Sequence, residues 1–193
     1  MDRDRLTAFT DGVLAVIITI MVLELRPPHG VGFRDLLALW PGYLSYVLSF
    51  IYIAIYWNNH HHFFQLVKRV DGAILWANMH LLFWLSIVPF ATAWMGEHLF
   101  AAAPAALYGF ALLGSAVAWY LMQTVIIRRQ GEASPLRTAI GRDLKGKLSP
   151  FAYLAGIALA FVSPALSYLL YLAVALAWLI PDRRVESAVS HRT

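Results

Sequence analysis

The stretch RLTAFTDGVLAVIITIMVLEL, which occupies residues 5–25, is apolar over most of its length. A helix of about 20 such residues is long enough to cross the hydrocarbon core of a lipid bilayer. Arg5, Asp11, Thr19 and Glu24 make this stretch unusual, because ionisable groups inside a membrane span are costly and generally face protein or water. The stretch therefore predicts a membrane helix whose polar side chains serve a function.

The composition of the whole chain also indicates a lipid environment. Of its 193 residues, 60% are hydrophobic and only 13% are charged, whereas about a quarter of the residues in a soluble protein are charged. The mean hydropathy is +0.63. The sequence contains no cysteine, which excludes disulfides, thiolate metal sites, iron–sulfur clusters and cysteine nucleophiles.

Further apolar segments predict an all-α integral membrane protein with six transmembrane helices. We expect one transmembrane domain over residues 1–193, in which the last two helices share an apolar run that is too long for a single ordinary span. Ser163-Pro164 at the middle of this run indicates a tight turn. The six predicted helices occupy about 5–26, 34–60, 71–95, 100–128, 148–162 and 164–181.

The distribution of basic residues predicts how these helices are oriented. Short cytoplasmic loops carry an excess of lysine and arginine, and with six spans and both termini in the cytoplasm only Arg26 and Arg34, out of 15 basic residues, lie outside. This topology accounts for the net charge of +4 without a nucleic-acid partner, and it predicts a multi-pass protein of the cell (inner or plasma) membrane. The predicted inner residues are Arg3, Arg5, Lys68, Arg69, Arg128, Arg129, Arg137, Arg142, Lys145, Lys147, Arg183, Arg184 and Arg192.

One face of the first helix is the candidate functional surface. Its members lie at positions i, i+3, i+4 and i+7, so they form a single stripe, which in an isolated helix is most often a packing face. Glu24 lies at the outer end of the helix and Asp11 near its inner end, so symmetric copies would place a ring of carboxylates that attracts cations at the outer mouth. The stripe consists of Val16, Thr19, Ile20 and Leu23.

Arg5, followed after three residues by Phe9-Thr10-Asp11, resembles the first-helix motif of the bacterial relatives of the lysosomal potassium channel. That family is marked by arginine, three residues and then Phe-Ser-Asp. Thr10 replaces the serine and keeps the hydroxyl group. The resemblance covers the first half of the chain well and the remainder only by topology. It extends to Ser49-Phe50, Tyr56-Trp57-Asn58-Asn59-His60-His61, Phe64, Asn78 and Pro89-Phe90-Ala91-Thr92.

The resemblance implies a homotetramer of six-helix subunits in which the first helix of each subunit lines a central pore. The pore would favour potassium among monovalent cations, with potassium as the permeant ion and no cofactor. Val16, Thr19, Ile20 and Leu23 match the pore-lining face, where rings of bulky side chains would narrow the pathway and can close it by dewetting. The chain has no Thr-Val-Gly-Tyr-Gly filter, so its selectivity must arise differently from that of carbonyl-lined channels.

Polar residues of the first three helices are expected to form a clamp at the cytoplasmic end of the bundle. Arg5, Asp11, Trp57 and His60 would lie together, because pairing lowers the cost of charges near lipid. His61, Asn78 and His80 are further candidates for this cluster. We assign the clamp a structural role. A metal site in His60-His61-His62 is disfavoured, because adjacent positions on a helix point in different directions.

Two other classes of protein remain open from the sequence. A proton-coupled secondary transporter could use Asp11 and the histidines, although such proteins usually show paired repeats and broken helices near the midplane, and the sequence shows neither. A membrane enzyme or haem protein could use His61 and His80 as ligands. Enzymes are disfavoured, because the sequence has no Gly-rich phosphate loop, His-Glu-x-x-His pair or Gly-x-Ser-x-Gly elbow.

Overall fold

The computed structural model describes residues 2–67, 69–131, 134, 136–137 and 143–179. Every regular element among these residues is a helix, and the prediction of an all-α protein is therefore confirmed. The helices are α1 (Arg3–Leu23), α2 (Phe33–Leu37), α3 (Trp40–Gln65), α4 (Gly72–Glu97), α5 (Ala102–Gln130), α7 (Leu144–Ala160) and α8 (Pro164–Leu179).

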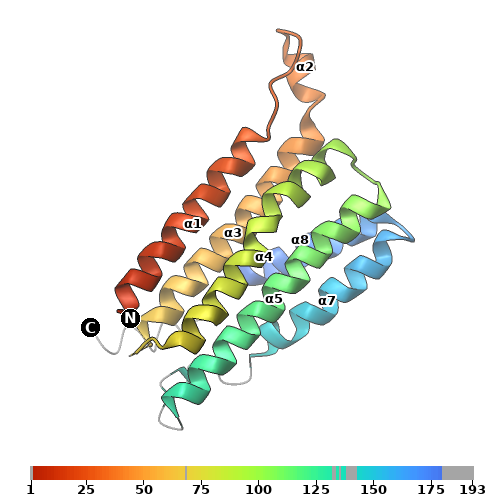
Figure 1. The fold of residues 1–193 in the computed structure, drawn as a ribbon. Coiled ribbons are helices and arrows are strands. Elements are labelled where there is room, and N and C mark those ends of the chain that lie inside the picture. The colour runs from red at the N-terminus through yellow and green to blue at the C-terminus, as the bar shows by residue number, and fades with distance from the viewer. Residues whose placement is uncertain (1, 68, 132–133, 135, 138–142, 180–193) are drawn as a thin grey trace.

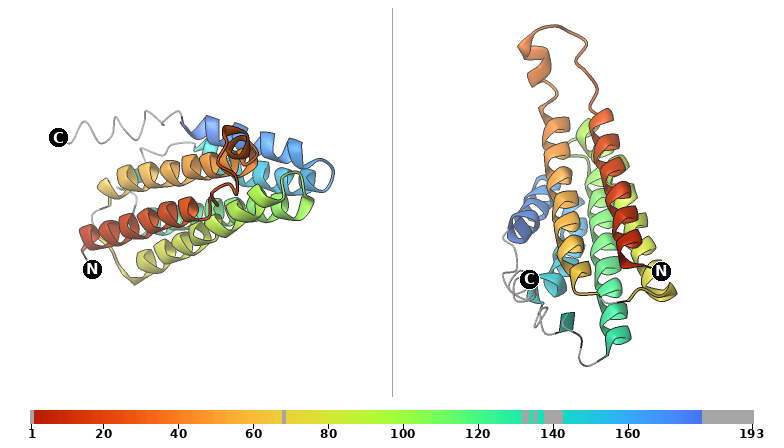
Figure 2. Two further views of the ribbon diagram at one scale, coloured as in Figure 1. Left: turned by 90° about the horizontal axis from the view of Figure 1, so that it is seen from above. Right: turned by 90° about the vertical axis from the view of Figure 1, so that its left-hand side faces the viewer.

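The long helices form a bundle in which α1 occupies one edge. α1 packs against α3 and α4, α4 continues onto α5, and α5 packs against α7 and α8. α8 also contacts α3, which closes the far side of the bundle. The short helix α2 stands beyond the outer ends of the other helices (Figures 1 and 2). Only one side of α1 is therefore covered by its own chain.

Local sequence signals explain where the helices begin and end. The carboxylate of Asp71 caps α4 by accepting a hydrogen bond from the backbone N–H of Ile74 at 3.0 Å, and Asp143 caps α7 by accepting from the N–H of Gly146 at 3.0 Å. Such caps satisfy backbone donors that have no partner inside the helix. α5 ends at Gly131, whose φ of 75° lies in the left-handed region that glycine adopts without strain.

The helix predicted at 34–60 differs from the observed structure at both ends. Its first residues form the separate helix α2, and α3 starts again at Trp40 with a proline in its first turn, where the missing N–H costs nothing. At the other end, the polar run of residues 58–62 continues as helix to Gln65, beyond the predicted end at about residue 60. The polar side chains extend α3 because two of its histidines find hydrogen-bond partners.

Among the residues that the structure describes, three helices are long and apolar enough to cross a membrane by length and composition: α1, α4 and α5. α8 is apolar but shorter. Six crossings and two cytoplasmic termini remain predictions. Lys68, Arg142, Arg183, Arg184 and Arg192, which contributed to the predicted orientation, lie outside the described residues, as does the end of the predicted helix 164–181.

Candidate functional site

α1 has one face buried against its own chain and one face exposed. The buried face consists of Leu6, Thr10, Leu14, Ile17 and Met21, which recur every three or four residues and pack against α3 and α4. The predicted stripe lies on the opposite side. Within a single chain Leu23 is 79% exposed, Val16 55% and Ile20 41%, and Thr19 is exposed as well.

Thr19 gives this stripe its one hydroxyl group. Its Oγ1 donates a hydrogen bond to the backbone oxygen of Val16 at 2.9 Å. Because the hydroxyl hydrogen points back to the helix, the lone pairs of the oxygen remain available on the exposed side. The stripe therefore combines bulky apolar side chains with one oxygen acceptor near its middle.

The C-terminal end of α1 carries negative charge. Glu24 is the C-cap residue of α1, and no basic residue lies in the last turn. Because the carbonyl end of a helix is itself partly negative, the carboxylate adds to a potential that attracts cations. Arg26 does not neutralise Glu24 but forms an ion pair with Glu97 at the end of α4, with Nη2 and Oε1 3.2 Å apart.

A buried chain of hydrogen bonds joins α1, α3 and α4 in the N-terminal half of α1. The side-chain amide of Asn78 donates to Thr10 Oγ1 at 2.9 Å, and Asn78 Oδ1 lies 3.0 Å from Nε2 of His60. All three residues are buried. The ring of His60 stacks on Phe64 with centroids 4.3 Å apart. These bonds link the three helices through groups that would otherwise be left unpaired in an apolar interior.

A second, exposed chain lies beside the first. Trp57 Nε1 donates a hydrogen bond to Asp11 Oδ1 at 3.0 Å, which ties α3 to α1. The indole of Trp57 stacks on His61 with ring centroids 6.0 Å apart and an interplanar angle of 27°. His61 Nε2 in turn lies 2.9 Å from Gln65 Nε2. Gln65 was not predicted as part of the clamp, although its i+4 spacing from His61 on one helix was a signal for it.

The structure thus brings together most of the predicted polar residues, but in two chains rather than in one cluster. Arg5 is exposed, and no described residue forms a hydrogen bond or an ion pair with its side chain. Phe9 is half exposed. His80 lies away from the clamp, because its Nε2 accepts a hydrogen bond from Trp84 Nε1 on its own helix at 3.0 Å.

Within the described part of the chain, no group of three or more His, Asp or Glu side chains could hold a metal ion. The successive histidines of α3 diverge as helix geometry requires. His60 is buried beside Asn78, whereas His61 is exposed beside Trp57.

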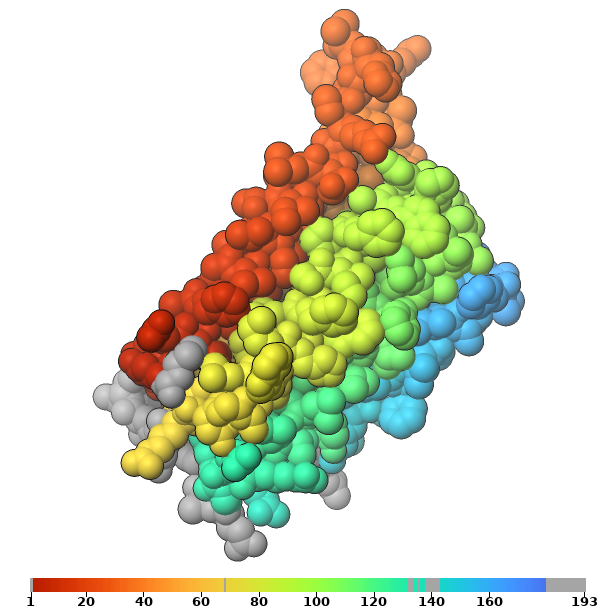
Figure 3. Space-filling model, in the orientation of Figure 1, coloured from red at the N-terminus to blue at the C-terminus, as the bar shows by residue number. Residues whose placement is uncertain are grey.

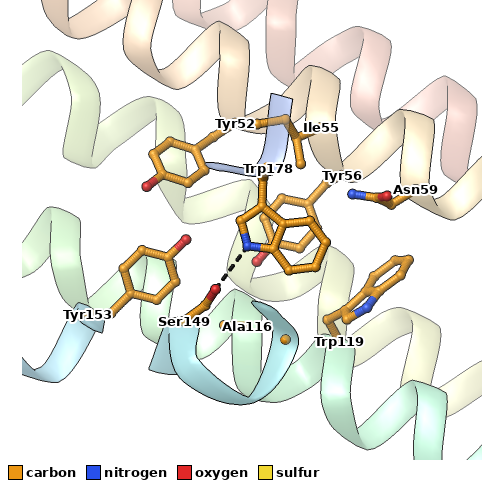
Figure 4. A pocket seen from close by; sticks show the side chains of 10 residues that line it. Tyr52, Ile55, Tyr56, Asn59, Ala116, Trp119, Ser149, Tyr153 and Trp178 are labelled. Carbon is orange, nitrogen blue, oxygen red and sulfur yellow. Dashed lines mark hydrogen bonds between the residues drawn. The ribbon is translucent and has the colours of Figure 1, made fainter. Parts of the chain in front are cut away.

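Away from α1, a small cavity lies among α3, α5, α7 and α8 (Figure 4). Trp178 Nε1 donates a hydrogen bond to Ser149 Oγ at its edge, at 2.9 Å. The cavity volume is about 30 Å³, which suffices for about one or two water molecules. It is therefore no part of a wide ion path. Its lining consists of Tyr52, Ile55, Tyr56, Asn59, Ala116, Trp119, Gly146, Ser149, Tyr153 and Trp178.

Known proteins resemble this chain in sequence and in fold. The family model of the endosomal/lysosomal potassium channel TMEM175 matches residues 5–89, a region that includes all residues of both hydrogen-bonded chains. A potassium channel of a Chryseobacterium species is 52% identical over 189 residues, which are 98% of each chain. A potassium channel of Streptomyces collinus is 33% identical over 179 residues, or 86% of each chain.

A solved structure resembles the whole subunit. It is the crystal structure of a lysosomal potassium-selective channel TMEM175 homolog from Chamaesiphon minutus, and it superposes with a TM-score of 0.82 at 33% sequence identity. The match covers 93% of this chain and 97% of that one. The first-helix motif lies on α1, which its own chain leaves half uncovered. Together with these matches, the motif shows that the chain belongs to the family of the endosomal/lysosomal potassium channel TMEM175.

Proposed function

We propose that this chain is the subunit of a potassium-selective cation channel that conducts ions passively through a central pore. The relatives from Chryseobacterium and Streptomyces are named potassium channels, and the similar solved structure is that of a potassium-selective channel. The observation that carries the proposal is the exposed stripe of α1. This helix carries the family's first-helix motif, and its own chain leaves one continuous face of it uncovered.

Four copies of the chain form the pore. One apolar helix per chain cannot enclose a column of water, whereas identical helices around a shared axis can, and most homo-oligomers close with cyclic or dihedral symmetry. The motif occurs once in the chain, so each chain supplies one pore-lining helix and four chains form a homotetramer of six-helix subunits. In this assembly Val16, Thr19, Ile20 and Leu23 face the axis.

The side chains of the stripe determine how ions pass. Rings of Val16, Ile20 and Leu23 narrow the path and permit closure by dewetting. The oxygen of Thr19, whose hydrogen is already donated to the backbone, provides an acceptor that partly replaces the hydration shell of a cation. Glu24 from each chain concentrates cations at the outer mouth. Potassium is the permeant ion in this mechanism, and no resident cofactor takes part.

The motif residues and the inter-helix polar network have a structural role rather than a catalytic one. They are Arg5, Phe9, Thr10, Asp11, Trp57, His60, His61 and Asn78. The chain through Asn78 and the chain through Asp11 hold α1 in a fixed rotation against α3 and α4. That rotation decides which side chains reach the axis. The protein crosses the cell membrane six times, with both termini in the cytoplasm.

Recordings from purified protein in planar bilayers test the proposal. With potassium chloride on one side and sodium chloride on the other, we expect current without an applied proton gradient and a reversal potential displaced toward that of potassium. A saturable flux that requires a proton gradient would instead support a proton-coupled transporter. Absence of current from correctly assembled protein would refute the channel.

A further inference from the structure

Arg5 lies on the same face of α1 as the exposed stripe. Figure 3 shows α1 along one edge of the molecule. Leu23 follows Arg5 after 18 residues, and at about 100° per residue this separation equals about five full turns of the helix. By the same count Val16 and Thr19 lie within about 40° of Arg5 around the helix axis. The guanidinium group is therefore in line with the stripe.

The exposed face of α1 is continuous from Arg5 to the stripe. Phe9 is 50% exposed and Gly12 is exposed as well, and both lie within about 40° of Arg5 around the axis. At a rise of about 1.5 Å per residue, Arg5 and Leu23 are about 27 Å apart along the helix. This length is close to the thickness of a hydrocarbon core, which is about 30 Å. In the proposed tetramer Arg5 therefore lies at the opposite mouth of the pore from Glu24.

No ion pair within the described part of the chain neutralises the charge of Arg5. The carboxylate of Asp4 pairs with Arg3 instead, with Oδ1 and Nη2 3.0 Å apart. Asp2 caps the helix by accepting a hydrogen bond from the backbone N–H of Asp4 at 3.3 Å, and Asp11 is bonded to α3. A guanidinium group stays charged at every physiological pH, and the N-terminal end of a helix is itself partly positive. This end of the exposed face therefore carries positive charge.

The two ends of α1 thus differ in the sign of their charge. Glu24 adds a carboxylate to the partly negative C-terminal end of the helix, whereas Arg5 adds a cation to the N-terminal end. Four copies around one axis turn each charge into a ring, and we call the two openings the Glu24 mouth and the Arg5 mouth. A ring of carboxylates concentrates cations and a ring of guanidinium groups depletes them.

We propose that Arg5 makes conduction asymmetric, so that potassium enters more readily from the Glu24 mouth than from the Arg5 mouth. The rate at which ions enter a mouth depends on their local concentration there. Equal voltages of opposite sign therefore drive unequal currents through the channel. The inference rests on the proposed channel, and it gives Arg5 an effect on conduction in addition to the structural role of the motif.

Single-channel recordings of the unmodified chain in symmetric potassium chloride test whether charge at the mouths acts on the current. The Debye length is about 30 Å at 0.01 M salt and about 3 Å at 1 M, so the mouth charges act at the low concentration and are screened at the high one. We expect currents at equal and opposite voltages to differ about two- to fivefold at about 0.01 M and to become nearly equal at about 1 M. A linear current–voltage relation at the low concentration would overturn the proposal, whereas absence of any current would refute the channel itself.

Thiol chemistry then assigns the asymmetry to one residue, because the chain has no cysteine of its own. Arg5→Cys channels should give a nearly linear current–voltage relation at the low salt concentration. A positively charged methanethiosulfonate reagent should restore the asymmetry, and a negatively charged one should increase the current that enters from this mouth. Each reagent should act from the chamber that faces the N-terminal end of α1, and in the unmodified chain the larger potassium current should flow toward that chamber.

Arg128→Gln is the matched control. Arg128 is exposed in the last turn of α5, a helix that packs against α4, α7 and α8 and lies outside the proposed pore. Its loss should leave the asymmetry unchanged, and Arg5→Lys, which keeps the charge at the mouth, should retain it. Arg5→Gln serves as the uncharged variant where Arg5→Cys subunits do not assemble. Full asymmetry in the uncharged Arg5 variants, or its equal loss in Arg128→Gln, would show that Arg5 does not produce it.

Discussion

Leu23 is the most exposed member of the α1 stripe in the single chain, and in the proposed tetramer it forms a constriction near the C-terminal end of α1. Leu23→Ala removes most of each side chain from the ring. We predict a larger single-channel conductance and weaker discrimination between potassium and sodium. Because the side chain makes few contacts within its own chain, the stability of the subunit should change by less than about 0.5 kcal/mol.

The control for this change is Leu154→Ala on α7, which removes the same atoms from an exposed position outside the proposed pore. It should leave conductance and selectivity unchanged in the same bilayer recordings. Unaltered conductance and selectivity for Leu23→Ala would mean that another face of α1 lines the path.

Asn78 is the central residue of the buried chain, since it bonds both Thr10 and His60. Asn78→Ala leaves both partners without their hydrogen bond. Interhelical hydrogen bonds in membrane proteins contribute about 0.6 kcal/mol each on average and up to about 1.7. Because the substitution removes two of them, we predict that the free energy of unfolding falls by about 1–3 kcal/mol. Thermal unfolding in detergent would measure it. Thr124→Ala, which removes an exposed hydroxyl bonded only to its own helix, should change the unfolding temperature much less.

Single residues differ in how well the sequence predicts their positions. The stripe of α1 could be predicted because helical periodicity alone decides which side chains share a face. The hydrogen bonds of the clamp could be predicted only as a group, because pairing depends on how the helices rotate against one another. His80 illustrates the limit: Trp84, four residues away on the same helix, supplies a local partner that competes with the expected distant one.

At the scale of helices, Asp11 and Trp57 hold α1 against α3 from the exposed side. Asp11→Ala removes the acceptor, so we predict a reduced fraction of tetramer in detergent, measured by size-exclusion chromatography with light scattering. Asp11→Asn keeps an oxygen that can accept from the indole N–H and should restore most of the tetramer. Equal assembly of all three proteins would show that this bond does not position α1.

The packing of α7 against α8 depends on the absence of a side chain at Gly156. A Cβ atom there would overlap the ring of Tyr171, whose hydroxyl donates a hydrogen bond to the backbone oxygen of Ala105. Overpacking a tight core costs about 1–3 kcal/mol, so Gly156→Ala should lower the unfolding temperature. Gly72→Ala, at a position with open space around it, should be neutral or slightly stabilising. Equal unfolding temperatures would contradict this packing.

The helices themselves were largely predictable, because long apolar runs bounded by proline, glycine and charge leave few alternatives in lipid. Two boundaries were not. α2 separates from α3 at Ala38 and Leu39 although the sequence there continues to be apolar. The polar end of α3 stays helical as far as Gln65. The partner of His60 lies on α4 and could not be read from α3 alone, whereas the partner of His61 is Gln65, four residues further along the same helix.

At the scale of the whole molecule, one subunit cannot form the proposed pore by itself. It covers one face of α1 and leaves the stripe of Val16, Thr19, Ile20 and Leu23 exposed. In the proposed tetramer the stripe faces the same stripe of the other copies, so its exposure cannot be explained from a single chain. For that reason the assembly is the level at which the account is tested most directly.

The decisive measurement is thiol modification of the pore during current recording, which the cysteine-free chain permits without background. Leu23→Cys and Thr19→Cys channels are treated with a positively charged methanethiosulfonate reagent, and Leu154→Cys serves as the control. The account predicts that potassium current falls progressively and irreversibly in both stripe variants and persists in the control. Full current through Leu23→Cys and Thr19→Cys channels whose modification is verified by mass spectrometry would contradict a pore lined by α1.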